Sequence, residues 1–180
     1  MRITRENTAG LVIDIQEKLM PVMEEQEALL RNCQILIEGL QVLGVPVIVT
    51  QQYTKGLGAT VEPIRSVIKD FNPIEKREFS CCDAASVTGQ LKEQNIKKVI
   101  ICGIESHVCV LQTAVDLKEA GYIPVVVMDC VSSRSWNSVD LASERFRHEG
   151  IMMTSCESIL FELTRSSAAP EFKAISTLVK

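Results

Sequence analysis

Residues 98–121 read KVIICGIESHVCVLQTAVDLKEAG, and this stretch decides the fold. Its first part, Lys98–Gly103, is short, apolar and rich in β-branched residues, which predicts a buried strand. The segment Ser106–Ala120 follows after a short gap and is closed by Gly121, which predicts a helix with a glycine at its C-terminus. A strand that leads directly into a helix is the repeating unit of a parallel sheet.

The same alternation of strand and helix runs along the whole chain. We predict further strands over Ala9–Ile15, Val45–Thr50, Ile123–Asp129 and Ile151–Ser155 and helices over Glu25–Leu43, Asp83–Gln94, Ser138–Glu149, Cys156–Leu163 and Pro170–Leu178. This pattern indicates an α/β fold, a doubly wound and mostly parallel sheet with helices on both faces, in three layers. With 180 residues, the chain has the length of a single domain, expected over residues 1–180.

Composition and charge exclude several classes of protein. The net charge is −4 and the basic residues are dispersed among acids, which argues against a nucleic-acid partner. No apolar stretch approaches the ~20 residues that a membrane-spanning helix needs, so we expect no membrane role. The seven cysteines are an odd number with irregular spacing, and no signal peptide is recognisable. Reduced thiols in a cytoplasmic protein fit these features best.

Polar residues follow the predicted strands where a doubly wound sheet binds its ligands, at the carboxyl ends of the strands. Asp14, the segment Gln51–Tyr53, the segment Glu105–Cys109 and Asp129 all occupy such positions. The long segment Gln51–Pro63 is expected to be a loop that covers the site. Its glycines do not form a dinucleotide-binding motif, because position 61 is Val and the glycines do not follow a strand directly.

Cys109 falls in the first turn of the helix that starts near Ser106, and we expect Ser106 or a residue close to it to be the N-cap. A helix N-terminus and a nearby ammonium group lower the pKa of a thiol, so we expect Cys109 to be reactive and to have a pKa below ~8.5. The alternative is that Cys109 is a small buried apolar residue. Asp14 closes a buried strand and is either functional or a structural capping or salt-bridge residue. Lys76 lies in Glu75–Glu78, which by itself is also typical of a solvated charged segment.

Four motifs resemble the isochorismatase-like cysteine hydrolases, the family that includes nicotinamidases. They are Leu11–Gln16 (LVIDIQ), Lys76–Ser80 (KREFS), Gly103–Ala114 (GIESHVCVLQTA) and Asp129–Ser135 (DCVSSRS), which occur in the order typical of the family. The resemblance implies a catalytic triad in which Cys109 is the nucleophile, Asp14 the general base and Lys76 the third member. It also implies a cis peptide bond between Ile104 and Glu105 and an oxyanion hole formed by the N–H groups of Glu105 and Cys109.

The chain departs from the named members of this family at two places. Nicotinamidases carry an Asp-x-His metal site after the second strand, whereas this sequence has Thr50-Gln51-Gln52-Tyr53. We therefore expect neither a metal nor another cofactor, and nicotinamide is disfavoured as substrate. The isochorismatases that gave the family its name lack the cysteine, so ether hydrolysis is disfavoured too. The motifs are most similar to a poorly characterised branch of the family.

The leading hypothesis is a metal-independent hydrolase of a small amide or related carbonyl compound that forms a thioester on Cys109. The alternative is a non-catalytic interaction protein with the same fold. Gln16, Tyr53 and Phe79 are the candidate substrate-binding residues. His107 is expected to be structural, because it lies two residues before Cys109 on a helix and faces away from the thiol. We expect a homo-oligomer whose contacts include the loop at Trp136.

Overall fold

A computed structural model describes residues 1–180 and contains a single sheet of six parallel strands. The strands are β1 (Thr8–Ile13), β2 (Val47–Gln52), β3 (Ile74–Lys76), β4 (Lys98–Ile104), β5 (Ile123–Ser132) and β6 (Met152–Thr154). Their order across the sheet is β3-β2-β1-β4-β5-β6, and every pairing is parallel. The predicted doubly wound α/β fold is therefore confirmed.

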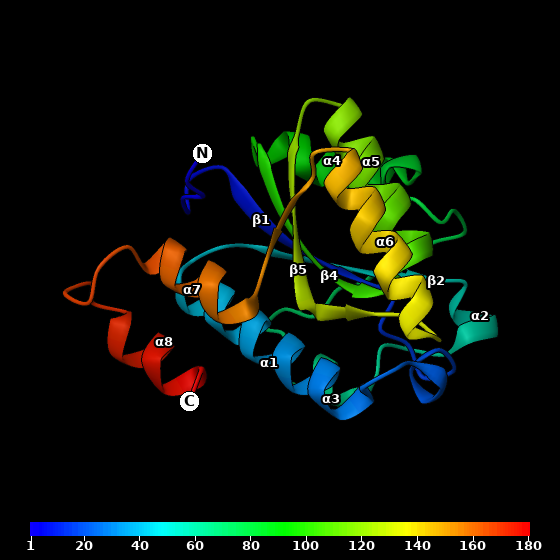
Figure 1. The fold of residues 1–180 in the computed structure, drawn as a ribbon, viewed down its shortest axis with the longest axis horizontal. Coiled ribbons are helices and arrows are strands. Elements are labelled where there is room, and N and C mark those ends of the chain that lie inside the picture. The colour runs from blue at the N-terminus through cyan, green and yellow to red at the C-terminus, as the bar shows by residue number, and fades with distance from the viewer.

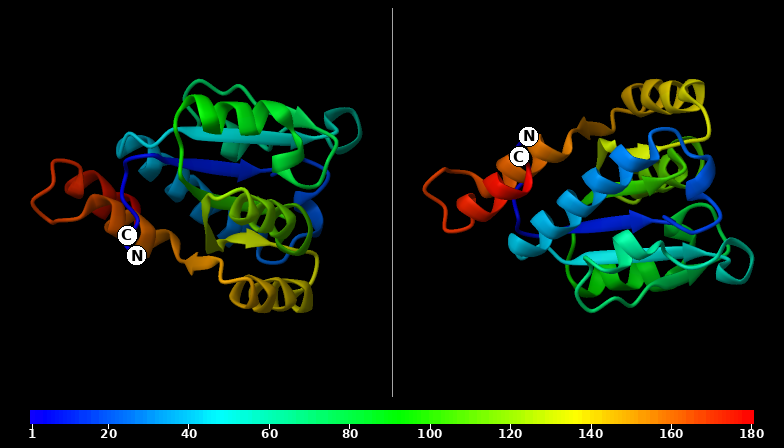
Figure 2. Two further views of the ribbon diagram at one scale, coloured as in Figure 1. Left: turned by 90° about the horizontal axis from the view of Figure 1, so that it is seen from above. Right: turned by 90° about the horizontal axis from the view of Figure 1, so that it is seen from below.

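Helices cover both faces of this sheet (Figures 1 and 2). One face carries α1 (Gln26–Val42), α3 (Glu62–Arg65), α7 (Cys156–Thr164) and α8 (Phe172–Leu178). The other carries α4 (Ala85–Glu93), α5 (Leu111–Glu119) and α6 (Trp136–His148). Shorter elements are α2 (Thr54–Leu57), two 3₁₀ turns (Met20–Val22 and Cys81–Asp83) and a π-helical turn (Ser106–Val110). None of the helices has the length and apolar character that crossing a bilayer demands.

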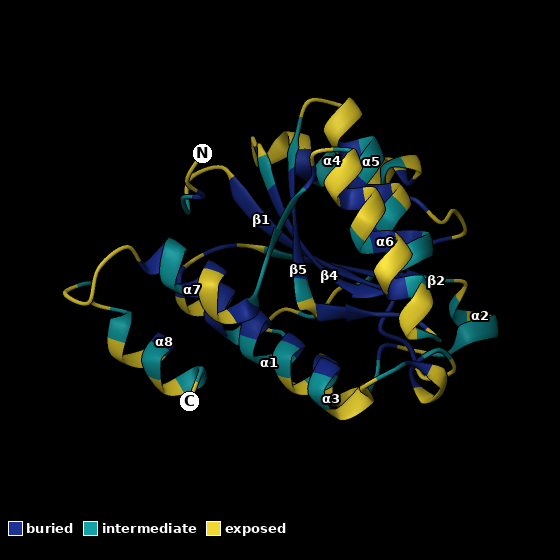
Figure 3. Ribbon diagram, viewed as in Figure 1, coloured by how far each residue is buried: buried dark blue, intermediate teal, exposed yellow.

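The hydrophobic core lies on both sides of the sheet, in the two layers between sheet and helices. Every residue of β1 is buried, as expected for a central parallel strand, and Figure 3 shows the sheet as buried and the outer helix faces as exposed. Leu11 and Ile13 pack towards α4, α5 and α6, whereas Val12 packs towards α1 and α7. This alternation follows from the two-residue period of a strand.

The sequence pattern did not predict β3, and it predicted a regular helix after β4 where the structure begins with a π-helical turn. The pattern of Glu75–Glu78 is by itself typical of a solvated charged segment, but Ile74–Lys76 pairs with Thr50–Gln52 as an edge strand. Three residues are too few to show the hydrophobic pattern by which a strand is recognised in a sequence. The helix after β4 begins with the π-helical turn. Its N-cap is Glu105, next to Ser106 and within the predicted range, but no side chain caps the turn.

The strand order places the reactive segments side by side. β1 and β4 are neighbours at the centre of the sheet, and the chain winds outward from them in opposite directions. Gly103 pairs with Ile13 at the carboxyl end, where a β-carbon on Gly103 would lie 2.1 Å from the Ile13 carbonyl oxygen. Only glycine permits this close approach, with a φ of +125°. Asp14 and the segment that leads to Cys109 are thereby brought together.

Candidate active site

An ion pair between Asp14 and Lys76 lies at the centre of the candidate site. Lys76 Nζ is 2.5 Å from Asp14 Oδ2, and both side chains are inaccessible to solvent. Asp14 follows β1 with a left-handed φ of 52°, and Lys76 is the last residue of β3. Lys76 also donates to the carbonyl oxygens of Glu78 and Phe79, at 3.0 and 3.2 Å. The three acceptors fix the ammonium group, so it is not the solvated lysine of a charged surface segment.

The second carboxylate oxygen of Asp14 also accepts a hydrogen bond. Thr50 Oγ1 donates to Asp14 Oδ1 at 2.7 Å from the buried strand β2, which lies between β1 and β3. The carboxylate is thus oriented from both sides. Thr50 is not among the predicted site residues. A hydroxyl group near the end of a buried apolar strand nevertheless indicates that a polar partner lies nearby.

Cys109 lies against this ion pair, in the π-helical turn that follows β4. Its side chain is 4% exposed, its thiol donates to Gln52 Oε1 at 4.0 Å, and it lies close enough to Asp14 and Lys76 for both charges to act on it. Burial and the negative charge of Asp14 raise the pKa of Cys109 to about 12, against the opposing effect of Lys76. The expected low pKa is therefore wrong. The carboxylate and the ammonium group act on the thiol together, and burial decides the outcome.

The pKa shifts of Cys109 and Lys76 determine which groups of the cluster are protonated at neutral pH. Burial by itself would lower the pKa of Lys76. The charge of Asp14 and those of other neighbouring groups act in the opposite direction and together outweigh burial, so the pKa is raised. Lys76 is accordingly a cation at neutral pH and Cys109 a thiol. The site places a protonated thiol beside a buried carboxylate, which is the arrangement that general-base activation of a thiol requires.

The segment before Cys109 is fixed by polar contacts with the end of β5. The peptide bond between Ile104 and Glu105 is cis. Glu105 Oε2 accepts from Arg134 Nε at 2.9 Å, and Nδ1 of His107 is 2.9 Å from Ser133 Oγ. These contacts orient the backbone at the position where the oxyanion hole is expected. His107 is thus engaged with Ser133.

The three candidate substrate-binding residues lie in different environments. Gln16 is fully buried: its Nε2 donates to the carbonyl oxygens of Gln52 and Gly58, and its Oε1 accepts from the Gln52 N–H. We infer that Gln16 positions the loop at residues 52–58 instead of contacting substrate. Tyr53 and Phe79 are 38% and 52% exposed and follow the ends of β2 and β3, where a ligand of the cluster would pass.

The carboxyl end of β2 does not fit a metal ion. Gln51 Oε1 accepts from the N–H and the hydroxyl of Thr60, both at 2.9 Å, and its amide is therefore already committed. Tyr53 is exposed, and the guanidinium carbon of Arg77 lies 4.3 Å from the centre of its ring. Neither a His nor a carboxylate is present between residues 50 and 53.

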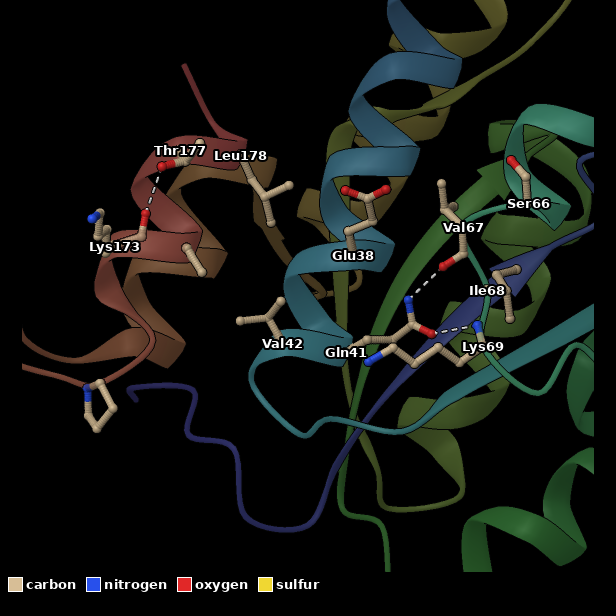
Figure 4. A pocket seen from close by; sticks show the side chains of 12 residues that line it. Glu38, Gln41, Val42, Ser66, Val67, Ile68, Lys69, Lys173, Thr177 and Leu178 are labelled. Carbon is tan, nitrogen blue, oxygen red and sulfur yellow. Dashed lines mark hydrogen bonds between the residues drawn. The ribbon is translucent and has the colours of Figure 1, made fainter.

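A large cavity lies away from this cluster. It is a groove of about 880 Å³ between α1, residues 66–69 and α8, and Figure 4 shows Gln41 at its floor, bonded to the backbone of Val67 and Lys69. None of its lining residues belongs to the Asp14 cluster. In a single chain the cluster is instead almost closed to solvent.

Comparison with known proteins agrees with this geometry. Residues 8–158 match the sequence model of the isochorismatase domain. The secreted isochorismatase effector Isc1 of Phytophthora sojae (strain P6497) is 35% identical over 99% of this chain and 87% of its own length. Isochorismatase domain-containing protein 2 of Danio rerio is 34% identical over 99% of this chain and 89% of its own length.

Solved structures give the same result. A structure described as a MAR1 ribonuclease from Caenorhabditis elegans has a TM-score of 0.94 and 37% identity, covering 99% of this chain and 92% of that one. The YcaC gene product of Escherichia coli, described as an octameric hydrolase of unknown specificity, has a TM-score of 0.92 at 22% identity, over 99% of this chain and 89% of that one. The second likeness shows the fold alone. On the family match, the two relatives and the shared fold, the chain belongs to the isochorismatase family, a membership that supports a hydrolase.

Proposed function

We propose that this protein is a metal-independent cysteine hydrolase of a small amide or related carbonyl compound, with Cys109 as nucleophile, Asp14 as general base and Lys76 as the third member of the triad. The observation that carries the proposal is the buried Asp14–Lys76 ion pair against the Cys109 thiol. A buried ion pair is costly to maintain unless its geometry is favourable, and this one lies where a doubly wound sheet binds its ligands.

In the first step, the Asp14 carboxylate takes the proton of the Cys109 thiol as the sulfur attacks the carbonyl carbon of the substrate. The carbonyl electron pair moves to oxygen, and the N–H groups of Glu105 and Cys109 stabilise this oxyanion, each contributing ~3 kcal/mol by analogy with other acyl-transfer sites. Lys76 stays protonated and holds Asp14 in place. The protonated nucleophile at rest fits this order of events, because proton transfer accompanies attack.

The intermediate then collapses. The carbon–nitrogen bond breaks, the amine leaves with the proton held by Asp14, and a thioester remains on Cys109. Water attacks the thioester carbonyl after giving a proton to Asp14, the carbon–sulfur bond breaks, and Asp14 returns the proton to the sulfur. The products are a carboxylic acid and an amine, and the enzyme is unchanged.

A panel of small amides assayed by burst kinetics tests the proposal. We expect a rapid release of amine equal to the enzyme concentration, together with an acyl adduct on the Cys109 peptide by mass spectrometry. Cys109→Ala should lose both signals, and a chelator should leave the rate unchanged. Turnover that survives Cys109→Ala, or that is lost on chelation, would contradict the mechanism. The absence of any adduct or turnover would favour the non-catalytic interaction protein.

RNA is included in the panel because of the relative from Caenorhabditis elegans, which is described as a ribonuclease. A net charge of −4 and a nearly closed cysteine site favour a small compound over a polyanion. RNA cleavage that requires Cys109 would replace the amide in the proposal. Cleavage that persists in Cys109→Ala would point to a contaminating nuclease.

We further propose that the protein works in the cytoplasm as a homo-oligomer. All seven cysteines are free, which fits a reducing compartment, although the relative from Phytophthora sojae is described as secreted. Self-association is supported by exposed aromatic side chains at the carboxyl edge of the sheet, where Tyr53, Phe79 and Trp136 are 38%, 52% and 53% exposed.

A further inference from the structure

Gln52 lies beside the proposed nucleophile, and the proposed mechanism does not use it. It is the last residue of β2, is half-buried, and pairs in register with Lys76 of β3. Its Oε1 is the atom to which the Cys109 thiol donates, with 4.0 Å between Sγ and Oε1. A polar side chain in contact with the attacking sulfur lies where a substrate has to bind.

The backbone of Gln52 is fixed by a single buried side chain. Gln16 Oε1 accepts from the Gln52 N–H at 2.7 Å, and Gln16 Nε2 donates to the Gln52 carbonyl oxygen at 2.9 Å. Gln16 is itself fully buried. Since both polar groups of the Gln52 backbone are occupied, the side chain of Gln52 starts from a fixed position at the end of the sheet.

The amide group of Gln52 has one orientation, which the backbone of Arg77 sets. Gln52 Nε2 donates to the Arg77 carbonyl oxygen at 3.3 Å. A carbonyl oxygen can only accept, so the NH₂ group of Gln52 must face Arg77 and Oε1 must face Cys109. The long contact with the thiol is the one hydrogen bond that Oε1 makes. Gln52 therefore presents a nearly free acceptor to the site.

The acceptors of the neighbouring ion pair are already used within the protein. Asp14 Oδ1 accepts from the hydroxyl group of Thr50, and Asp14 Oδ2 accepts from Lys76. Lys76 also occupies two backbone carbonyl oxygens. Gln52 Oε1 is thus the acceptor that a substrate can reach without breaking a bond of the ion pair.

We propose that Gln52 is a specificity-determining residue, whose Oε1 accepts a hydrogen bond from the N–H of the amide that is cleaved. The inference rests on the proposed hydrolase function, and it selects amides that carry an N–H over esters. The substrate carbonyl oxygen is assigned to the N–H groups of Glu105 and Cys109. The amide nitrogen is bonded to the same carbon. With the sulfur about 3–3.5 Å from this carbon, the nitrogen comes within reach of Oε1.

Binding of such an amide also redirects the proton of the thiol. At rest the Cys109 S–H donates to Gln52 Oε1. When a substrate N–H takes this acceptor, the S–H turns to the Asp14 carboxylate, whose charge already acts on the thiol. The proton then points at the proposed general base. An ester has no N–H to displace the thiol, and its alkoxy oxygen meets Oε1 as one acceptor against another.

Alkylation of Cys109 by two reagents tests the proposal in the full-length protein. Iodoacetamide carries N–H groups on its carbonyl carbon, whereas methyl iodoacetate carries a methoxy group there, and both lose iodide to the sulfur. The ratio of the two rates at Cys109, divided by the same ratio for glutathione, is the selectivity. It cancels the intrinsic reactivity of the reagents and the pKa of the thiol. We expect a selectivity of about 10 for the wild type, because a partly buried acceptor left unpaired is costly, and a value close to unity for Gln52→Met.

Two further variants separate the acceptor from structural effects. Gln52→Glu keeps acceptor oxygens at this position and should retain the selectivity, although its charge slows both reagents. Gln90→Met is the matched control, because Gln90 is also half-buried but lies on α4, and it should behave as the wild type. Cys33 and Cys102 are buried and stay unlabelled in a folded variant, so the same peptide map distinguishes lost selectivity from unfolding.

A wild-type selectivity close to unity overturns the proposal, and so does a selectivity that Gln52→Met retains. Alkylation needs no turnover, so this result does not depend on the hydrolase function. Amide turnover that requires Cys109, together with a selectivity close to unity, would keep the hydrolase and remove the role of Gln52. Selectivity that depends on Gln52 without any turnover would keep the amide-binding role and contradict the hydrolase.

Discussion

The behaviour of Cys109 is decided by its burial and by the opposing charges of Asp14 and Lys76. The sequence places a thiol near a helix N-terminus and an ammonium group, and both lower a thiol pKa. The structure adds burial and the Asp14 carboxylate, and these raise the pKa of Cys109 to about 12. We therefore propose that Cys109 is activated by proton transfer to Asp14 during attack and not by a thiolate present at rest.

This assignment predicts opposite effects of Asp14→Asn and Lys76→Met on the alkylation of Cys109 by iodoacetamide. Asp14→Asn removes a negative charge, so the pKa of Cys109 falls and alkylation at about pH 9 becomes faster, although turnover is lost. Lys76→Met removes the cation and slows alkylation. A change of one pKa unit alters the thiolate fraction about tenfold in this range. Peptide mapping against time measures both rates.

Lys118→Met is the control, because Lys118 lies at the C-terminal end of α5, remote from the thiol, and should leave the alkylation rate unchanged. An Asp14→Asn variant that alkylates more slowly than wild type would contradict the charge argument. Equal rates in all variants would show that access, and not ionisation, controls Cys109.

At the scale of elements, the long strands and helices were predictable and the shortest ones were not. α1 was expected over Glu25–Leu43 and spans Gln26–Val42, because its apolar face and Gly44 mark it clearly. β3 was not predicted because a strand of three residues shows no recognisable hydrophobic pattern. This strand contains Lys76. The resemblance to the family, and not the pattern, selected that residue. The positioning roles of Thr50 and Gln16 depend on contacts between distant segments, which local sequence does not encode.

The close approach of β1 and β4 gives a test of the element that builds the site. Gly103→Ala places a β-carbon against the Ile13 backbone at a φ of +125°, and we expect a loss of about 3 kcal/mol or more in the free energy of unfolding. Gly89→Ala is the matched control: nothing lies within 4 Å in α4, and the change should stabilise by about 0.5–1 kcal/mol. Urea denaturation measures both variants, and a Gly103→Ala protein as stable as wild type would disprove the tight contact.

For the whole molecule, several buried thiols make the stability dependent on alkaline pH. Burial raises the pKa values of Cys81 and Cys109 to about 11 and about 12, above those of the unfolded chain. The folded state therefore keeps protons that the unfolded state loses, so stability is complete below about pH 8.5 and falls as the pH rises towards 12. Thermal unfolding between pH 7 and pH 11 should show a falling Tm, and Cys81→Ala should reduce the slope.

Assembly is the last property that follows from the molecule as a whole. Exposed aromatic side chains surround the nearly closed Asp14–Lys76–Cys109 cluster, and Trp136 at the start of α6 is 53% exposed. We expect Trp136→Glu to dissociate the assembly, because a carboxylate buried in an apolar contact is left without a partner. Sedimentation velocity should then give a 20.0 kDa species in place of a larger one. Val42→Glu, at the opposite edge of the sheet in the α1–α8 groove, should leave the assembly intact. If Val42→Glu dissociates the protein and Trp136→Glu does not, the subunits meet through that groove, and the aromatic edge is left to the substrate.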